Sequence, residues 1–150
     1  MGITSKQRGR HLFGDIGFTP GGNSQMKFAK VTFDPTANAA QRAIAAHALG
    51  TLPNGAVVVG GFIVVNTTFT SNGADAGTIA ISVEGANDIK AAIAIADVTN
   101  PWDAGKQAII PKANTPETTS VTLSAERSIT ATVAAQTLLG GKATIYLLYV

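Results

Sequence analysis

The longest run of strand-forming residues in the chain spans residues 57–69 and contains two adjacent glycines, Gly60 and Gly61. The odd positions of this run stay apolar on both sides of the glycines, which is the two-residue period of a β-strand. A hairpin that turns at the glycines is the alternative. It would leave a very short first arm directly after the turn signal at 52–55. We therefore expect one strand, about 56–70, with a glycine bend or bulge.

The rest of the chain predicts further short strands separated by turn residues. Residues 40–49 are rich in alanine and suit a helix on propensity alone, but their strand-rich setting favours a strand. The last segment is apolar on both faces, which suits a central strand or one buried in an interface. Seven or eight short strands indicate an all-β protein, an antiparallel β-sandwich that is jelly-roll-like. The expected segments are 27–33, 78–85, 86–98 as a helical turn or a strand, 108–110, two strands within 120–135, and a strand after a glycine turn in 140–150.

The first 26 residues differ from the rest, and we expect an extended N-terminal arm at 1–26 followed by one sandwich domain at 27–150. The arm has scattered apolar residues with no period of either kind. Residues 1–30 hold one acidic side chain, Asp15, and five basic ones: Lys6, Arg8, Arg10, Lys27 and Lys30. Such an arm either contacts an acidic partner or is a solvated terminus. Five basic residues are fewer than a nucleic-acid-binding surface usually carries, which argues against nucleic acid as a partner.

The composition limits the class of protein. Charged residues make up 13% of the chain, against about 25% in an average soluble protein. Either partners cover much of the surface, or the surface is rich in Thr, Ser and Asn. The chain has no cysteine, which excludes disulfides and thiolate chemistry. We see no signal peptide and no apolar run approaching the ~20 residues that span a membrane, so we expect no membrane partner.

No group of residues predicts catalysis, a cofactor site or a metal site, and we expect a protein that is not an enzyme. The only histidines are His11 in the arm and His47, which we expect to be structural. Nucleophile elbows, Walker loops and dinucleotide-binding motifs are absent. The acidic pairs are expected to be solvated loop residues; they are Glu84 with Asp88, and Asp97 with Asp103.

The only tryptophan, Trp102, lies in an irregular segment at 100–116 that is punctuated by proline and glycine. A tryptophan in such a setting either fills the core of the sandwich or is an exposed interface anchor. Two lysines nearby, Lys106 and Lys112, would suit docking on an acidic surface.

Four segments together carry a resemblance: "LPNGAVVVGGFIVVNTTFTSNG", "TIAISVEGANDIKAA", "PWDAGKQAIIPKANTPE" and the terminal "GGKATIYLLYV". In their order and spacing, over roughly residues 27–150, they resemble the capsid decoration proteins of tailed bacteriophages, also called cement or head-stabilising proteins. The resemblance implies a jelly-roll-like sandwich, a homodimer or homotrimer, no catalysis and no cofactor. It also implies a strand at 40–49.

The resulting hypothesis is a virion structural protein that binds the outer surface of the major capsid protein shell and is made in the cytoplasm of the host bacterium. The candidate partner-binding residues are Lys6, Arg8, Arg10, Phe13, Phe18, Trp102, Lys106 and Lys112. One alternative is another virion module, such as a head fibre base or a tail component. Another is a carbohydrate-binding sandwich for host attachment, built on loops 70–77 and 99–119. The low aromatic content, with one Trp and two Tyr, disfavours the carbohydrate alternative.

Overall fold

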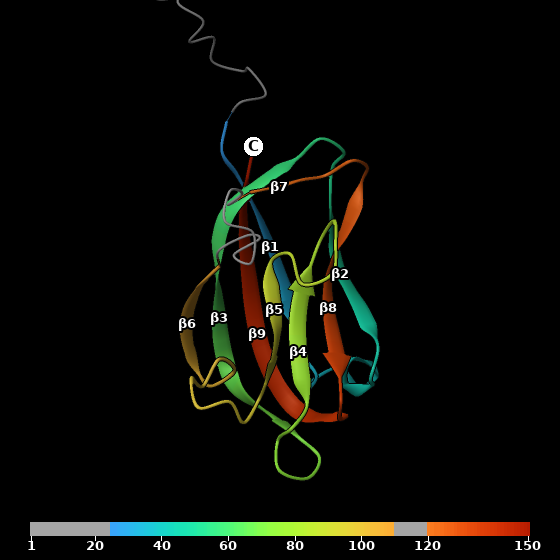
Figure 1. The fold of residues 1–150 in the computed structure, drawn as a ribbon, viewed down its shortest axis with the longest axis vertical. Coiled ribbons are helices and arrows are strands. Elements are labelled where there is room, and N and C mark those ends of the chain that lie inside the picture. The colour runs from blue at the N-terminus through green and yellow to red at the C-terminus, as the bar shows by residue number, and fades with distance from the viewer. Residues whose placement is uncertain (1–24, 110–119) are drawn as a thin grey trace, which may run out of the picture.

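The computed structural model describes residues 25–109 and 120–150, and in these two segments nearly all regular structure is β-strand (Figure 1). A single turn of 3-10 helix is the only helical element there, so no described helix could cross a membrane. Of the predicted arm at 1–26, only the last two residues are described. The elements are β1 (Lys27–Phe33), η1 (Ala39–Arg42), β2 (Ala46–Leu52), β3 (Val57–Ser71), β4 (Thr78–Ser82), β5 (Lys90–Ala94), β6 (Gly105–Ile109), β7 (Val121–Thr122), β8 (Arg127–Ala134) and β9 (Leu138–Tyr149).

The strands form two antiparallel sheets. One has the order β1-β9-β3-β6, with β7 also paired to β3, and the other has the order β2-β8-β4-β5. β6 pairs with residues 61–65 of β3 and β7 pairs with residues 57–58. Because β9 occupies the other edge of β3, β6 and β7 lie end to end and together act as one interrupted strand. Counted this way, eight strands form two four-stranded sheets in jelly-roll order, which confirms the predicted fold class.

The core lies between the two sheets and is formed by alternate residues of each strand. Ile79 and Ile81 of β4 and Ile129 and Val133 of β8 are almost fully buried in it. Three aromatic rings pack against one another in one region of this core. Phe33 stacks on Phe69 with ring centroids 5.6 Å apart, and Trp102 meets Phe69 edge-on at 5.5 Å.

β3 is a single strand of 15 residues that runs through Gly60 and Gly61, so the hairpin alternative is excluded. The predicted unbroken alternation of its odd positions is wrong, however. Before the glycines the even position, Val58, is fully buried and the odd position, Val59, is exposed. After the glycines the odd position, Ile63, is fully buried. The register against β9 shifts between Val58 and Gly60, because Val59 is the extra residue of a β-bulge.

Gly61 is required by a close approach of two backbones. Its φ of +151° is unfavourable for residues with a side chain, and a Cβ placed there would overlap the carbonyl oxygen of Tyr146 on β9. Gly60 has open space where its Cβ would be. Only the second glycine of the pair is therefore needed for β3 to lie against β9.

Residues 40–49 contain both a helical turn and a strand. η1 ends at Arg42 and β2 begins at Ala46, so the predicted strand is wrong for the first residues of this segment and confirmed for the last. The turn forms because the side chain of Asn38 accepts a hydrogen bond from the backbone N–H of Ala40, as an N-cap does.

Two other segments depart from or refine the prediction. The ambiguous segment at 86–98 contains strand β5. Gly140 and Gly141 do not form a turn, because β9 already begins at Leu138. The preceding turn instead contains Ala135 with a positive φ of 65°. β9 lies between β1 and β3, which confirms that the last strand is central.

A hydrogen-bonded carboxylate joins the loop after β4 to the turn before β8. Glu84 accepts hydrogen bonds from Arg127 Nε at 2.9 Å, from Arg127 Nη2 at 3.1 Å and from Ser124 Oγ at 2.5 Å. These bonds, with Arg127 the larger cause, lower the pKa of Glu84 to about 2. The same loop is organised by Asp88, whose carboxylate accepts the backbone N–H groups of residues 83–85.

We predict a pH dependence of stability from this carboxylate. The pKa of Glu84 is about 2 in the folded chain and rises toward 4.5 on unfolding, so its contribution is complete above about pH 4.5 and is lost as the pH falls toward 2. Glu84→Gln should therefore lower the urea midpoint at neutral pH, and this deficit should shrink below pH 4.5. Glu126→Gln, at an exposed position, is the control. Parallel pH profiles for wild type and Glu84→Gln would contradict this account.

We also predict that the two adjacent glycines differ in their tolerance of alanine. Gly61→Ala should lower the free energy of unfolding by about 2–4 kcal/mol, because the Cβ forces β3 and β9 apart. Gly60→Ala should change it by less than about 1 kcal/mol. Urea unfolding followed by circular dichroism measures both, and equal effects would show that the close approach to Tyr146 is not the constraint.

Candidate functional site

The outer face of the β1-β9-β3-β6 sheet carries two aromatic side chains flanked by lysines. Tyr146 on β9 lies directly opposite Phe62 on β3, and their rings stack with centroids 4.6 Å apart. Lys30 Nζ on β1 lies 5.8 Å from the Tyr146 centroid, and Lys106 Nζ on β6 lies 5.4 Å from the Phe62 centroid. These four residues, called the aromatic row below, cross four strands and are held by stacking and cation–π attraction.

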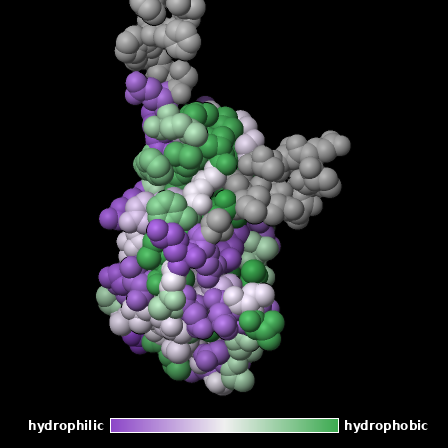
Figure 2. Space-filling view, turned by 90° about the vertical axis from the view of Figure 1, so that its left-hand side faces the viewer, coloured by the Kyte–Doolittle hydropathy of each residue, from purple (hydrophilic) through white to green (hydrophobic). Residues whose placement is uncertain are grey.

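An apolar patch adjoins the aromatic row where β1 begins and β9 ends. Phe28 lies opposite Leu148, which lies opposite Gly60. Hydrophobic residues gather at this end of the molecule in Figure 2, which is seen from the side of β3 and β6. The patch contains four of the seven large hydrophobic residues that the described chain exposes. It consists of Met26 (56% exposed), Phe28 (65%), Val59 (37%) and Val150 (36%), together with the half-buried Leu148.

The charged side chains beside the two rings are both positive in the described segments. Lys30 and Lys106 are exposed there. Of the two ion pairs that form among the described residues, Arg127 with Glu84 lies away from this sheet, and Lys142 with Asp34 lies at the other end of it, where β1 ends. The aromatic row and the apolar patch together are called the docking face below. It presents an apolar surface within a positive field.

The outer face of the other sheet has a different character. A shallow hollow of about 500 Å³ there is lined by small residues of β4, β5 and β8 and by the loop after β4. The strand residues that line it are Thr78, Ala80, Ser82, Ala92, Thr130, Thr132 and Ala134. The hollow lacks an aromatic side chain to serve as an anchor and a stacking platform for a sugar ring, so this face is a weaker candidate than the docking face.

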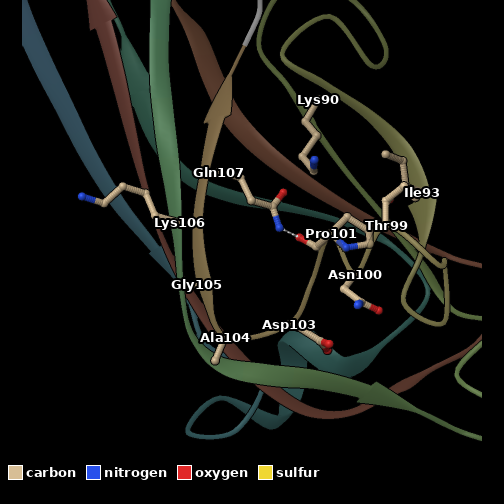
Figure 3. Close-up of a pocket in the computed structure, with 10 residues that line it drawn as sticks. All are labelled: Lys90, Ile93, Thr99, Asn100, Pro101, Asp103, Ala104, Gly105, Lys106 and Gln107. Atoms are coloured by element: carbon tan, nitrogen blue, oxygen red, sulfur yellow. Dashed lines mark hydrogen bonds between the residues drawn. The ribbon is translucent and has the colours of Figure 1, made fainter.

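A second hollow, of about 580 Å³, opens between the edge strands β5 and β6 (Figure 3). Lys90 and Ile93 line it from β5, and the side chain of Gln107 on β6 donates a hydrogen bond to the Pro101 carbonyl at its floor. Lys90 Nζ lies 5.5 Å from the centroid of the Trp102 ring, and burial lowers the pKa of Lys90. This hollow has the size of a small-ligand site, but its chemistry is that of one half-buried lysine and one carboxylate, Asp103, among mostly loop residues.

The structure separates two residues that the sequence placed together. Trp102 is fully buried in the core, so the core position is the correct one of its two alternatives and an exposed anchor at Trp102 is wrong. Lys106 points away from the hollow to the other side of β6 (Figure 3), where it belongs to the aromatic row. The remaining candidates, Lys6, Arg8, Arg10, Phe13, Phe18 and Lys112, lie outside the described residues.

The sequence did not single out Phe28, Lys30, Phe62 or Tyr146. Two signals pointed toward them. The β1 segment alternates Ala29, Val31 and Phe33 with the set that contains Phe28 and Lys30, and the last strand is apolar on both faces. What was lacking was the strand order, which places these outward positions side by side.

The titratable residues form no catalytic arrangement in the described segments. No group of three or more His, Asp or Glu side chains lies close enough there to hold a metal ion. His47 Nε2 lies 3.0 Å from the Ala43 carbonyl oxygen, and its ring stacks on Phe33 at 6.0 Å. Asp97 accepts hydrogen bonds from the backbone and hydroxyl of Thr99, which lower its pKa. These contacts are structural.

Comparison with known proteins finds no matching family model and no matching curated protein. Three solved structures share the fold. A chain of the acidic stable capsid structure of Helicobacter pylori bacteriophage KHP30 is 16% identical with a TM-score of 0.57, covering 84% of this chain and 87% of that one. A chain of the cyanophage Pam1 capsid asymmetric unit is 17% identical with a TM-score of 0.54, covering 83% and 82%. A chain of the capsid of Ralstonia phage GP4 is 20% identical with a TM-score of 0.56, covering 85% and 84%. At these identities the likeness shows the shared fold alone.

The contrasting positions of Trp102 and Phe62 give a testable difference. Trp102→Ala should lower the free energy of unfolding by about 3–5 kcal/mol, because it empties part of the core. Phe62→Ala should cost about 1 kcal/mol, because that ring lies half-exposed on the sheet surface. Circular dichroism in urea measures both without relying on tryptophan fluorescence. A smaller loss for Trp102→Ala than for Phe62→Ala would contradict these positions.

Proposed function

We propose that this chain is a bacteriophage virion protein without enzymatic activity, a decoration or cement protein that binds the outer surface of the major capsid protein shell and stabilises the head. The observation that carries the proposal is the shared jelly-roll fold. Chains from three separate phage capsid structures match it over more than four-fifths of this chain and of their own lengths.

Two features of the described residues support the proposal. The exposed aromatic and apolar side chains of the docking face suit a protein partner, because buried aromatic anchors supply much of the affinity at protein interfaces. The titratable groups described above are engaged in structural hydrogen bonds and ion pairs rather than in a nucleophile–base arrangement.

We further propose that the protein acts as a homodimer or homotrimer. A shell repeats the same site many times, so an oligomer that engages several sites gains avidity without new contacts. Light scattering on the free protein determines the number of copies.

The test is a binding titration with shells of the phage that encodes the chain, assembled without it. We expect saturable co-sedimentation and a higher temperature of shell disruption when the protein is bound. A reconstruction of the decorated particle then locates the protein. If it lay in the tail or in a head fibre, the decoration role would be rejected in favour of another virion module, and a glycan-array hit without shell binding would favour host attachment.

The basic N-terminal segment gives a separate prediction. Deletion of residues 1–26 removes Lys6, Arg8 and Arg10, together with Met26 of the apolar patch, but leaves every described strand intact. We expect the shortened protein to unfold at a similar urea concentration and to occupy fewer sites on shells at equal protein concentration. Full decoration by the shortened protein would show that this segment does not contribute to binding.

A further inference from the structure

We infer that the docking face itself binds an acidic, partly apolar protein surface, which under the proposed function is a patch on the shell. This inference names the surface and the chemistry of the partner, and it rests on the proposed function. The face lies on the β1-β9-β3-β6 sheet, with Phe28 as its most exposed apolar residue and Lys30 and Lys106 as the cations of its aromatic row.

The charge of the face selects the kind of partner. Lys30 and Lys106 are the charged side chains that the described strands place on it. A second copy that packed its own docking face against this one would bring the lysines of both copies together, and like charges oppose such pairing. A partner with carboxylates around an apolar centre would neutralise these lysines and receive Phe28.

The geometry of the rings disfavours a nucleic acid. Single-stranded nucleic acid binds aromatic side chains by stacking its bases on open ring faces. Here Tyr146 and Phe62 stack on each other, and a lysine ammonium approaches each ring. The rings are thus engaged within the aromatic row and serve better as part of a flat contact surface than as separate stacking platforms.

The size of the face matches one part of a larger interface. Four strands spaced about 4.8 Å apart make it about 14 Å wide, and residues 26–30 extend it by a similar length along the strands. Such a face covers a few hundred Å², which is less than the ~800 Å² that a stable complex buries on each partner.

The experiment uses the full-length protein, shells assembled without it, and two pairs of variants. Lys30→Gln with Lys106→Gln removes two positive charges from the face, and Thr51→Glu with Val98→Glu is a control with the same change in net charge at exposed positions elsewhere. Phe28→Ser removes the apolar anchor. Its control is Ile44→Ser, where the side chain is similarly exposed at 55%. Circular dichroism checks that all variants fold.

We expect the lysine pair variant and Phe28→Ser each to bind shells about tenfold more weakly than wild type, with both controls within about twofold. The lysine effect should shrink between about 50 and 300 mM salt because screening weakens it, whereas the Phe28 effect should persist.

Four outcomes overturn the inference, and they differ in what else they affect. Shell binding by wild type and equally by the face variants would reject the docking face while leaving the proposed function in place. No shell binding by wild type would reject both. Altered light scattering of the free face variants would show that the face joins copies of this chain. Binding of wild type to a thymidine oligonucleotide that the face variants lose would show that the face binds nucleic acid.

Discussion

The close contact between β3 and β9 is the interaction on which the rest of the molecule depends. β9 is the centre of the five-stranded sheet, and β3 joins it to β6 and β7. At Gly61 the two backbones approach so closely that no side chain fits. The next residue, Phe62, then stacks directly on Tyr146 across the same pair of strands. A contact that orders the backbone of the sheet therefore also sets the ring stacking on its outer surface.

The bulge at Val59 has a similar double consequence. An extra residue in one strand reverses which side chains point inward on either side of it. Val58 consequently enters the core, and Val59 joins the exposed apolar patch beside Phe28 and Leu148. Without the bulge, the odd positions would stay on the inner face along the whole strand, and the patch would lack one of its residues. The candidate docking face thus arises from local irregularities of β3, at the point where the sequence places two glycines in a run of β-branched residues.

How far the sequence predicted this structure depends on the range of the interaction that decides each feature. Alternation and turn residues are local signals, and they predicted the all-β sandwich and the single long β3. The helical turn at Ala39–Arg42 was missed because a side-chain cap at Asn38 outweighed the strand-rich setting. The glycines at 140–141 look like a turn in sequence, but in the structure a Cβ at Gly141 would collide with Phe69. The role of Gly141 comes from a residue about seventy positions away.

The candidate site illustrates the same limit more strongly. Trp102 stood out in the sequence because it is unique and lies among prolines and glycines, yet rarity alone does not distinguish a core residue from an anchor. Its burial against Phe69 is a long-range contact. Lys30, Tyr146, Phe62 and Lys106 come from four strands that are far apart in the chain, and each is unremarkable in its own segment. They become a surface only through the order β1-β9-β3-β6. An interaction surface on a jelly roll is thus a property of strand order, and it is found by asking which outward positions the topology makes neighbours.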